Sequence, residues 1–580
     1  MRTTFKNLQK KDIFFILICA VLVVTQVWLE LKMPDYTQKL TELVSSGNAD
    51  MDAVLQNGGK MLLCAVLSMG AAIICGFFAS HVAANFARTL RIRLFDRITN
   101  FGDSEINRFS TPSLITRTTN DVVQLQMLIA IGLQVMIKAP VMAVWAIGKI
   151  SATNVQWTEA TLATVMIMVA LIGVLVGLCY PRFKKIQKLT DDLNNATREN
   201  ISGVRVVRAF NADEYQHNKF EKINNNVMRN NLFTSRLMGL MMPVLQLCMS
   251  GLTLAIYWIG AYVINDAPLM DKATQMGNMT AFTQYALQVV MSFMMLIMIF
   301  VILPRTMVSA RRIAEVLNTK SSISYRDKAV SAEKTGELEF RNVSFKYGDA
   351  DNDCINDISF KINKGETFAI IGATGSGKST IVNLIPRYYD VTGGEILLDG
   401  VDIREYPEEQ LQKKISIAPQ KAVMFMGDIK SNVIYGFEEN ADDERVKRAL
   451  KIANADFVDD LTDGINERVA QGGTNYSGGQ KQRLSIARAI YKDSEIMIFD
   501  DTFSALDYKT DMLVRKAIKE NLKGTTVIIV AQRIGTIKNA DKILVLDEGR
   551  IVGMGTHKEL LDNCAIYKEI ALSQLSKEEL

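Results

Sequence analysis

The sequence predicts a two-part membrane protein, in which an all-α domain of six membrane-spanning helices precedes a soluble α/β domain. Two observations predict this organisation. Long apolar stretches stop near residue 303, although 48% of all residues are apolar and 22% are charged. After that point, a buried-strand pattern enters a glycine-rich turn in "FAIIGATGSGKST". We therefore expect a membrane domain at 1–303, a linker at 304–336 and the second domain at 337–580.

Composition argues against several classes of function. The net charge of +4 is small and scattered, and no basic tract with interleaved aromatic residues indicates nucleic acid binding. There are seven cysteines and no CxxC pair, and five of the cysteines lie inside apolar stretches. We interpret these five as small apolar side chains rather than as a disulfide framework or a zinc site.

Six stretches are long enough to cross a bilayer, which requires about 20 apolar residues. The first is too long for a signal-peptide core and has no cleavage site after it, so we expect it to be retained. Lysine and arginine are concentrated before span one and in the connections after spans two and four, which predicts that both termini are cytosolic. The estimated spans are 12–33, 60–83, 124–149, 158–181, 237–264 and 278–303.

The two cytosolic connections lack glycine, proline and serine clusters, so they are predicted to be helices that continue past the membrane. Within the spans, Lys138 is the clearest ionisable group. It either lines a polar cavity or snorkels or pairs with a neighbouring helix. The sixth span is rich in Met and Phe, which indicates either ordinary packing or an adaptable wall for varied apolar ligands.

The pattern GxxxxGK[ST] at 372–379 is the most specific motif, with a chance probability of ~0.02 in a chain of this length. Its glycines allow backbone N–H groups to surround phosphates. Lys378 should reach the β- and γ-phosphates of a nucleotide, and the Ser379 hydroxyl should hold Mg²⁺. The predicted ATP-binding residues here are Gly372, Ala373, Thr374, Gly375, Ser376, Gly377, Lys378, Ser379 and Thr380.

Two aspartates follow the apolar strand in "IMIFDD". Asp500 ends the strand, where its carboxylate would complete the Mg²⁺ shell. Asp501 comes next, where a base would orient or deprotonate an attacking water. The aspartate side chain is ~1.5 Å shorter than that of glutamate. A displacement of about 1 Å can lower a rate about 100-fold.

The segment "NYSGGQKQRLSIARAI" at 475–490, together with these motifs, resembles the nucleotide-binding domain of ABC transporters. The six-span half resembles that of an ABC exporter half-transporter, so the resemblance covers essentially the whole chain. It implies that Tyr347 stacks on adenine, that Gln420 senses Mg²⁺ and that Asp507 belongs to the D-loop. It also implies coupling helices near 111–118 and 211–216. The signature motif comprises Ser477, Gly478, Gly479 and Gln480, preceded by Tyr476 in place of the usual leucine.

The chain departs from the family pattern at two catalytic positions. The family usually has glutamate at the position of Asp501 and histidine near that of Gln532. None of the three histidines, His81, His217 and His557, replaces the latter. Gln532 can donate a hydrogen bond to a γ-phosphate but cannot carry the proton of an imidazole. Gln471 also stands where exporters often have glutamate, with a consequence left open.

In such transporters each of two ATP sites joins one chain's phosphate loop to the other chain's signature. The resemblance therefore implies that the site built on Asp500, Asp501 and Gln532 binds MgATP but hydrolyses it poorly. The signature here would serve a hydrolytic site on the partner. Because a homodimer would have two impaired sites, we expect an obligate heterodimer with a catalytically intact half-transporter.

The favoured activity is ATP-driven export of lipophilic compounds or drugs across a bacterial plasma membrane. The apolar, Met-rich spans and the absence of an acidic cavity cluster support it, together with analogy to asymmetric exporters. A lipid or peptide exporter would share every motif, although no protease domain precedes span one. The motifs are also compatible with an importer that has the exporter fold, and with a regulatory ATP-binding subunit that gates its partner.

Overall fold

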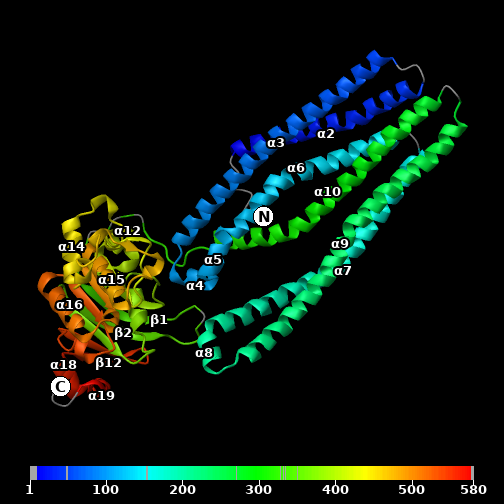
Figure 1. Cartoon of the computed structure of the whole chain (residues 1–580). Helices are drawn as coiled ribbons and strands as arrows, with labels where there is room; N and C mark the ends of the chain where they lie inside the picture. Colours follow the sequence, from blue (N-terminus) through cyan, green and yellow to red (C-terminus); the bar gives the residue numbers. More distant parts are fainter. Residues whose placement is uncertain are drawn as a thin grey trace. The chain divides into compact units, whose positions relative to one another are not determined.

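The computed structural model describes residues 10–46, 50–151, 155–268, 271–326, 328, 330, 332, 335–348 and 350–575. The chain divides into two compact units. A helical unit comprises Met1–Asp96 and Leu114–Asn318, and a sheet unit comprises Arg97–Ser113 and Thr319–Leu580. Figure 1 draws both units in sequence colours.

The helical unit contains six helices that are long and apolar enough to cross a membrane, among the residues that the structure describes. Each contains one predicted span and is longer than that span, and the predicted boundary at 303 falls inside the last helix. In the apolar window of the second long helix only 11% of residues are buried, which suits a helix facing lipid or another chain. The long helices are α2 (Lys10–Ser45), α3 (Met51–Thr99), α6 (Asn120–Ser151), α7 (Val155–Ser202), α9 (Asp213–Asp266) and α10 (Lys272–Asn318).

Packing within the helical unit centres on α10, which contacts α2, α6 and α9. Helix α10 packs along α6 and α2, and α7 runs beside α9, with the short α8 (Val204–Ala209) at the turn between them (Figure 1). Trp157 is fully buried at the centre of the main apolar cluster and contacts Phe282 across the α7–α10 interface, with ring centroids 5.2 Å apart. Burial of such large rings, rather than helix propensity alone, fixes how the helices pair.

The sheet unit is built on a six-stranded sheet of order β12-β11-β3-β10-β9-β6. Its inner strands are parallel, and only the edge strand β12 is antiparallel. Alternate residues of β9 enter two different apolar clusters on opposite faces of the sheet, as a strand covered on both sides requires. The strands are β3 (Thr367–Gly372), β6 (Ile415–Ala418), β9 (Ile496–Asp500), β10 (Thr526–Val530), β11 (Lys542–Asp547) and β12 (Arg550–Gly555).

A second sheet of order β2-β1-β4-β5 is antiparallel and covers one of these faces. A two-stranded ribbon of β7 (Gly427–Asp428) and β8 (Arg468–Val469) completes the strands. The antiparallel strands are β1 (Leu338–Phe345), β2 (Ile355–Ile362), β4 (Gly393–Leu398) and β5 (Val401–Asp402). The helices of the unit are α11 (Lys378–Leu384), α12 (Glu408–Lys414), α13 (Ile429–Val433), α14 (Asp443–Ile452), α15 (Gly478–Lys492), α16 (Tyr508–Asn521), α17 (Ile534–Ile537), α18 (His557–Asn563) and α19 (Ala565–Gln574). Six apolar helices followed by an α/β nucleotide-binding fold confirm the predicted fold class.

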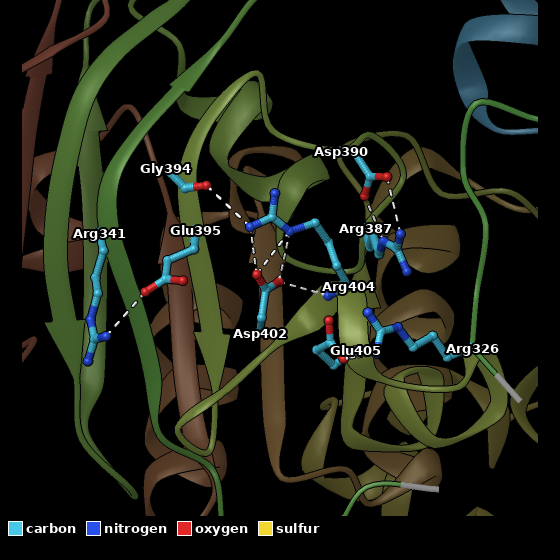
Figure 2. Close-up of polar contacts among 9 residues, drawn as sticks. All are labelled: Arg326, Arg341, Arg387, Asp390, Gly394, Glu395, Asp402, Arg404 and Glu405. Carbon is cyan, nitrogen blue, oxygen red and sulfur yellow. Dashed lines mark hydrogen bonds and ion pairs between the residues drawn. The ribbon is translucent and has the colours of Figure 1, made fainter. Parts of the chain in front are cut away.

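Ion pairs lie along the strands and loops of the antiparallel sheet (Figure 2). Arg341 pairs with Glu395 at 3.2 Å, and Arg404 pairs with Asp402 at 2.6 Å. The buried Arg387 binds Asp390 at 2.6 Å and also donates to the Ser324 carbonyl oxygen at 3.0 Å. Arg387 thus joins the chain that leaves α10 to the loop after α11.

The segment Arg97–Ser113 belongs to the sheet unit although it lies between two long helices in sequence. Its helix α4 (Asp103–Phe109) contacts the loop after α11, where Asn107 donates to the Tyr389 hydroxyl at 3.3 Å. Ser110 then adopts a φ of 61°, which ends α4 and redirects the chain. Helix α5 (Thr111–Thr118) covers the segment expected to be a coupling helix, and its first residues belong to the sheet unit, whereas Arg117 forms an ion pair with Glu315 of α10. The coupling role of this segment stays a prediction.

Candidate nucleotide-binding site

The glycine-rich loop lies between β3 and α11, at the carboxyl edge of the parallel strands. Gly375 and Gly377 have φ values of +86° and +98°, which other residues rarely adopt. A Cβ at Gly377 would lie 2.7 Å from Ile355 Cγ2, and one at Gly372 would lie 2.2 Å from the Leu546 carbonyl oxygen. Only glycine therefore permits this loop, which has the tight curvature that exposes backbone N–H groups to a phosphate.

Lys378 begins α11 and folds back over the loop. Its Nζ donates to the carbonyl oxygens of Gly372 at 2.9 Å and Ala373 at 2.7 Å. Burial lowers the pKa of Lys378, and the nearby carboxylates of Asp501 and Asp500 oppose that effect. The loop thus holds a cation at its centre through backbone carbonyls, in a position to exchange those contacts for phosphate oxygens.

Asp500 lies at the end of β9, opposite Val530 of β10. Burial raises its pKa from 3.8 to about 6, and the neighbouring Asp501 carboxylate adds to the effect while Lys378 opposes it. A carboxylate that is costly to ionise is suited to a site that gains a cation.

These residues fit MgATP. In the part of the chain that the structure describes, no group of three or more His, Cys, Asp or Glu side chains is arranged to hold a metal. A site with one carboxylate, Asp500, and one hydroxyl, Ser379, matches the way Mg²⁺ is bound when phosphates and water supply its remaining ligands.

Asp501 is the meeting point of three chain segments. Its Oδ2 accepts hydrogen bonds from Nε2 of Gln420, at 3.2 Å, and from Nε2 of Gln532, at 3.0 Å. Its backbone is left-handed, with a φ of 46°, and its N–H donates to the Val530 carbonyl oxygen at 2.9 Å. Burial raises the pKa of Asp501, opposed by the hydrogen bonds from Gln420 and Ser504. The structure therefore brings together all three residues singled out from separate motifs.

Tyr347 lies beside the loop in an aromatic group with Phe345 and Tyr389, at centroid distances of 4.8 and 5.3 Å. Its hydroxyl lies 3.2 Å from Thr380 Oγ1, and Cys354 Sγ is also 3.2 Å from that oxygen. Cys354 was not predicted to be near the site. It follows a short polar loop rather than a motif, and only the β1–β2 pairing brings it to the phosphate loop.

The signature segment forms the start of α15. Ser477 is the N-cap residue, and its hydroxyl accepts from the Gln480 N–H at 3.3 Å while the Gln480 side chain accepts from the Ser477 N–H at 2.9 Å. Tyr476 is buried and donates to the Arg468 carbonyl oxygen at 3.3 Å, so it fills the apolar position of a leucine while using its hydroxyl. Gly478 and Gly479 complete the turn.

The remaining predicted site residues have local structural roles. Asp507 caps α16, and hydrogen bonds from the Thr510 hydroxyl at 2.7 Å and the Thr510 N–H at 3.0 Å lower the pKa of its carboxyl. Gln471 is exposed in the turn before the signature. Lys138 lies in the helical unit, where its Nζ is 2.8 Å from Oε1 of Glu30 on α2, so it pairs with a neighbouring helix. Glu30 was not singled out from the sequence.

Comparisons with known proteins agree with this geometry. The family model for the ABC transporter transmembrane region matches residues 13–293, and the ABC transporter model matches residues 355–504. An uncharacterized ABC transporter ATP-binding protein of Mycobacterium tuberculosis (strain CDC 1551 / Oshkosh) is 38% identical over 92% of both chains. The Bacillus subtilis (strain 168) protein YfiB, described in the same words, is 34% identical over 97% of this chain and 96% of its own.

Two further similarities come from proteins with more specific descriptions. An ATP-dependent lipid A-core flippase of Hahella chejuensis is 32% identical over 89% of this chain and 88% of its own. Among solved structures, a bacterial Atm1-family ABC exporter with ATP bound superposes with a TM-score of 0.79 at 23% identity, over 98% of this chain and all of its own. At that identity the superposition establishes the fold.

Proposed function

The chain belongs to the ABC transporter family, and we propose that it is one half of a heterodimeric exporter whose own ATP site holds nucleotide but rarely cleaves it. The observation that carries this proposal is the Asp501 carboxylate, whose Oδ2 accepts hydrogen bonds from both Gln420 and Gln532. A general base needs a free oxygen within reach of water. Here the two amides hold one oxygen of a carboxylate whose side chain is ~1.5 Å shorter than that of glutamate, so its other oxygen stops short of the water that a glutamate would reach.

Binding of MgATP would use the remaining residues. Tyr347 stacks on the adenine, and the N–H groups of the 372–379 loop, with Lys378, hold the phosphates. Ser379, Gln420 and Asp500 hold Mg²⁺, which neutralises the charge on the phosphates. None of these positions departs from the family pattern, so this chain retains tight nucleotide binding.

The partner chain completes the second site. The signature Ser477, Gly478, Gly479 and Gln480, with Asp507 nearby, would face the γ-phosphate held by the partner's loop. Ser477 caps the Gln480 N–H of α15, and the N–H groups of Gly478 and Gly479 at the start of that helix would donate to the anion. A partner with an intact glutamate then supplies most of the hydrolysis.

Restoration of the family residues tests the asymmetry. In the purified two-chain complex, the partner's catalytic glutamate is replaced by glutamine, which leaves only the site of this chain. Asp501→Glu together with Gln532→His should then raise the residual ATPase rate at least 10-fold, the scale expected for repositioning a base by about 1 Å. Asp501→Glu with Gln532 retained is the matched control and should give a smaller gain. Brisk hydrolysis at this site before any substitution would refute the proposal.

The identity of the partner is tested by affinity purification. A tag on this chain should recover a second, different half-transporter in equal amount after detergent extraction. Recovery of a symmetric homodimer with two active sites would contradict the proposed pairing.

The proposed cargo is a lipophilic compound, moved outward across a bacterial plasma membrane with both termini in the cytosol. The apolar exposed faces of the long helices and the Met-rich α10 support this class. The flippase description of one relative favours a lipid cargo specifically. Stimulation of ATP hydrolysis by drugs but not by lipids or peptides would identify drugs as the cargo class. Uptake of the compound into inside-out vesicles would establish that transport is outward.

A regulatory subunit that only gates its partner is the competing candidate function. It predicts that removal of ATP binding from this chain changes the partner's rate but that no substrate contacts this chain's helices. Photo-crosslinking of a transported compound to α10 would decide against it.

A further inference from the structure

Helix α2 carries polar side chains that contact α6 and α10. We call this line of polar contacts between α2 and its two neighbours the seam. Gln38 donates to Asn278 of α10 at 2.7 Å, and Thr41 lies 3.3 Å from Thr280 of the same helix. Two acidic residues of α2, Glu30 and Asp35, each form an ion pair with a lysine of α6. Ionisable side chains among apolar helices are costly, and their retention usually marks a ligand pathway.

The Asp35 pair is fully engaged. Both oxygens of its carboxylate accept from Lys149 Nζ, at 3.1 and 3.0 Å. The Tyr285 hydroxyl also donates to Oδ1, and Lys32 lies 3.9 Å from Oδ2. Both carboxylate oxygens of Asp35 therefore accept hydrogen bonds within the protein, as expected of a structural ion pair.

The Glu30 pair is not fully engaged. Lys138, Gln26 and Ser68 all donate to the same oxygen, Oε1, at 2.8, 2.8 and 3.5 Å. Within the described ranges no contact involves Oε2, and Lys138 uses one of its three N–H donors. Both side chains retain 19% exposure, so the unused groups are accessible.

A further unused acceptor lies on α10. The Gln288 side chain donates from Nε2 to the Glu30 carbonyl oxygen at 3.5 Å, while its Oε1 is buried and has no partner among the described residues. Unsatisfied polar atoms in an apolar interior are costly, and each calls for a donor from water or a ligand. Three helices thus contribute two acceptors and an ammonium group that lack some of their hydrogen-bond partners, on side chains that are linked through contacts to Glu30.

We propose that the Glu30–Lys138–Gln288 group is the polar subsite of the transport pathway and that it takes a zwitterionic headgroup, an ammonium close to a phosphate or carboxylate. This inference rests on the proposed transport function and adds the substrate class. The ammonium donates to Glu30 Oε2 and the anion accepts from Lys138, and Gln288 Oε1 becomes a second acceptor for the ammonium when its side chain turns out of the interior. Because the ion pair is neutral, a ligand with no net charge completes it without leaving a buried charge.

A single-charge ligand fits less well. A cation competes with Lys138 for Glu30 and leaves the lysine unpaired, and an anion leaves Glu30 unpaired. A neutral amphiphile gains the apolar contacts of the surrounding helices but none of the charge-assisted hydrogen bonds. The subsite is therefore expected to bind a zwitterion more tightly than a cation, an anion or a neutral amphiphile. Apolar contacts alone would not distinguish these four ligand types.

The test uses the complete two-chain complex in lipid nanodiscs and a lysophosphatidylethanolamine with a fluorescent acyl chain. Its affinity is compared with those of a monoacylglycerol, an alkylamine and an alkyl phosphate that carry the same chain. The zwitterion should bind about tenfold tighter than each comparator, the effect of one charge-assisted hydrogen bond. Glu30→Gln and Lys138→Met should each reduce that preference to about threefold or less.

Lys149→Met is the matched control, because it removes the fully engaged ion pair of the same seam. It should leave both the zwitterion preference and the basal ATPase rate unchanged. Elution as a single peak in size-exclusion chromatography shows whether the Glu30 and Lys138 variants fold. Equal binding of all four amphiphiles by the unaltered complex would overturn the inference even if those variants fail to fold.

This experiment, with ATP hydrolysis measured in parallel, distinguishes failure of the zwitterion subsite from failure of the proposed transport function. If ATP hydrolysis responds to amphiphiles without preference for the zwitterion, transport stands and the subsite is wrong. If no amphiphile alters hydrolysis or crosses the membrane, the proposed transport function itself fails. Loss of preference in Lys149→Met as well would assign the effect to general disruption of the seam and contradict the subsite.

Discussion

Removal of the Asp500 charge should stabilise the sheet unit while it abolishes magnesium-dependent nucleotide binding. The carboxyl has a pKa of about 6 instead of 3.8, mainly because it is buried and next to Asp501. A folded-state pKa above the unfolded value means that ionisation opposes folding. The difference between 3.8 and about 6 corresponds to a cost of about 3 kcal/mol at neutral pH.

The stability gained by Asp500→Asn depends on pH in a defined direction. The cost is present in full above pH 6, decreases as the pH falls through 6, and vanishes below 3.8, where the carboxyl is protonated in both states. Asp500→Asn has no charge to bury, so its stability advantage of about 3 kcal/mol should be complete at pH 8 and largely lost by pH 4. For a unit of this size, that advantage corresponds to about 6–12 °C in the melting temperature.

The assay is thermal unfolding of the purified complex without nucleotide and with EDTA, at pH values from 8 to 4. Asp460→Asn, which removes an exposed carboxyl of the same unit, is the control and should leave the transition unchanged. ATP binding in the presence of Mg²⁺ is measured in parallel and should weaken at least tenfold in Asp500→Asn. An Asp500→Asn variant that melts at or below the temperature of the unaltered protein at pH 8 would refute the reasoning.

Three further outcomes are expected. Gly377→Ala should destabilise the sheet unit by about 1–3 kcal/mol, since its φ is +98° and its Cβ would lie 2.7 Å from Ile355 Cγ2; chemical denaturation measures this, and an unchanged midpoint contradicts it. Lys378→Met should weaken ATP binding at least tenfold, measured by titration with labelled nucleotide, whereas Lys378→Arg should lose less because it keeps the charge. Ser477→Ala should lower stability by about 1 kcal/mol through loss of the α15 cap and also slow hydrolysis in the complex, and a loss of stability alone would assign Ser477 a purely structural role.

Short motifs were predictable from sequence because their chemistry depends on neighbouring residues. The glycines of the phosphate loop, Lys378 and Asp500 follow from local strand and turn patterns, and the structure places them together at one sheet edge. The sequence predicted separate roles for Gln420, Asp501 and Gln532 but did not predict that both amides donate to the Asp501 carboxylate. Their shared hydrogen bonds depend on the order of β6, β9 and β10 in the sheet.

Contacts between distant helices were not predictable in the same way. The partner of Lys138 depends on the rotation of α2 about its own axis, which a helix without a distinct polar face does not specify. The end of α4 was not predictable either, because Ser110 adopts a positive φ that its residue type does not indicate. Both features depend on long-range packing rather than on local pattern.

The membership of helix α4 in the sheet unit affects how this protein can be divided for experiments. Within the unit, Ser104 lies 3.0 Å from the Ser322 hydroxyl, and the ideal Cβ of Gly102 would lie 3.1 Å from Ile323. A recombinant ATPase fragment that starts at residue 319 would lack this cover and expose apolar and hydrogen-bonding groups to solvent. Co-expression of a peptide spanning 97–113, or its fusion ahead of residue 319, is therefore the way to obtain a soluble fragment that behaves as it does in the intact chain.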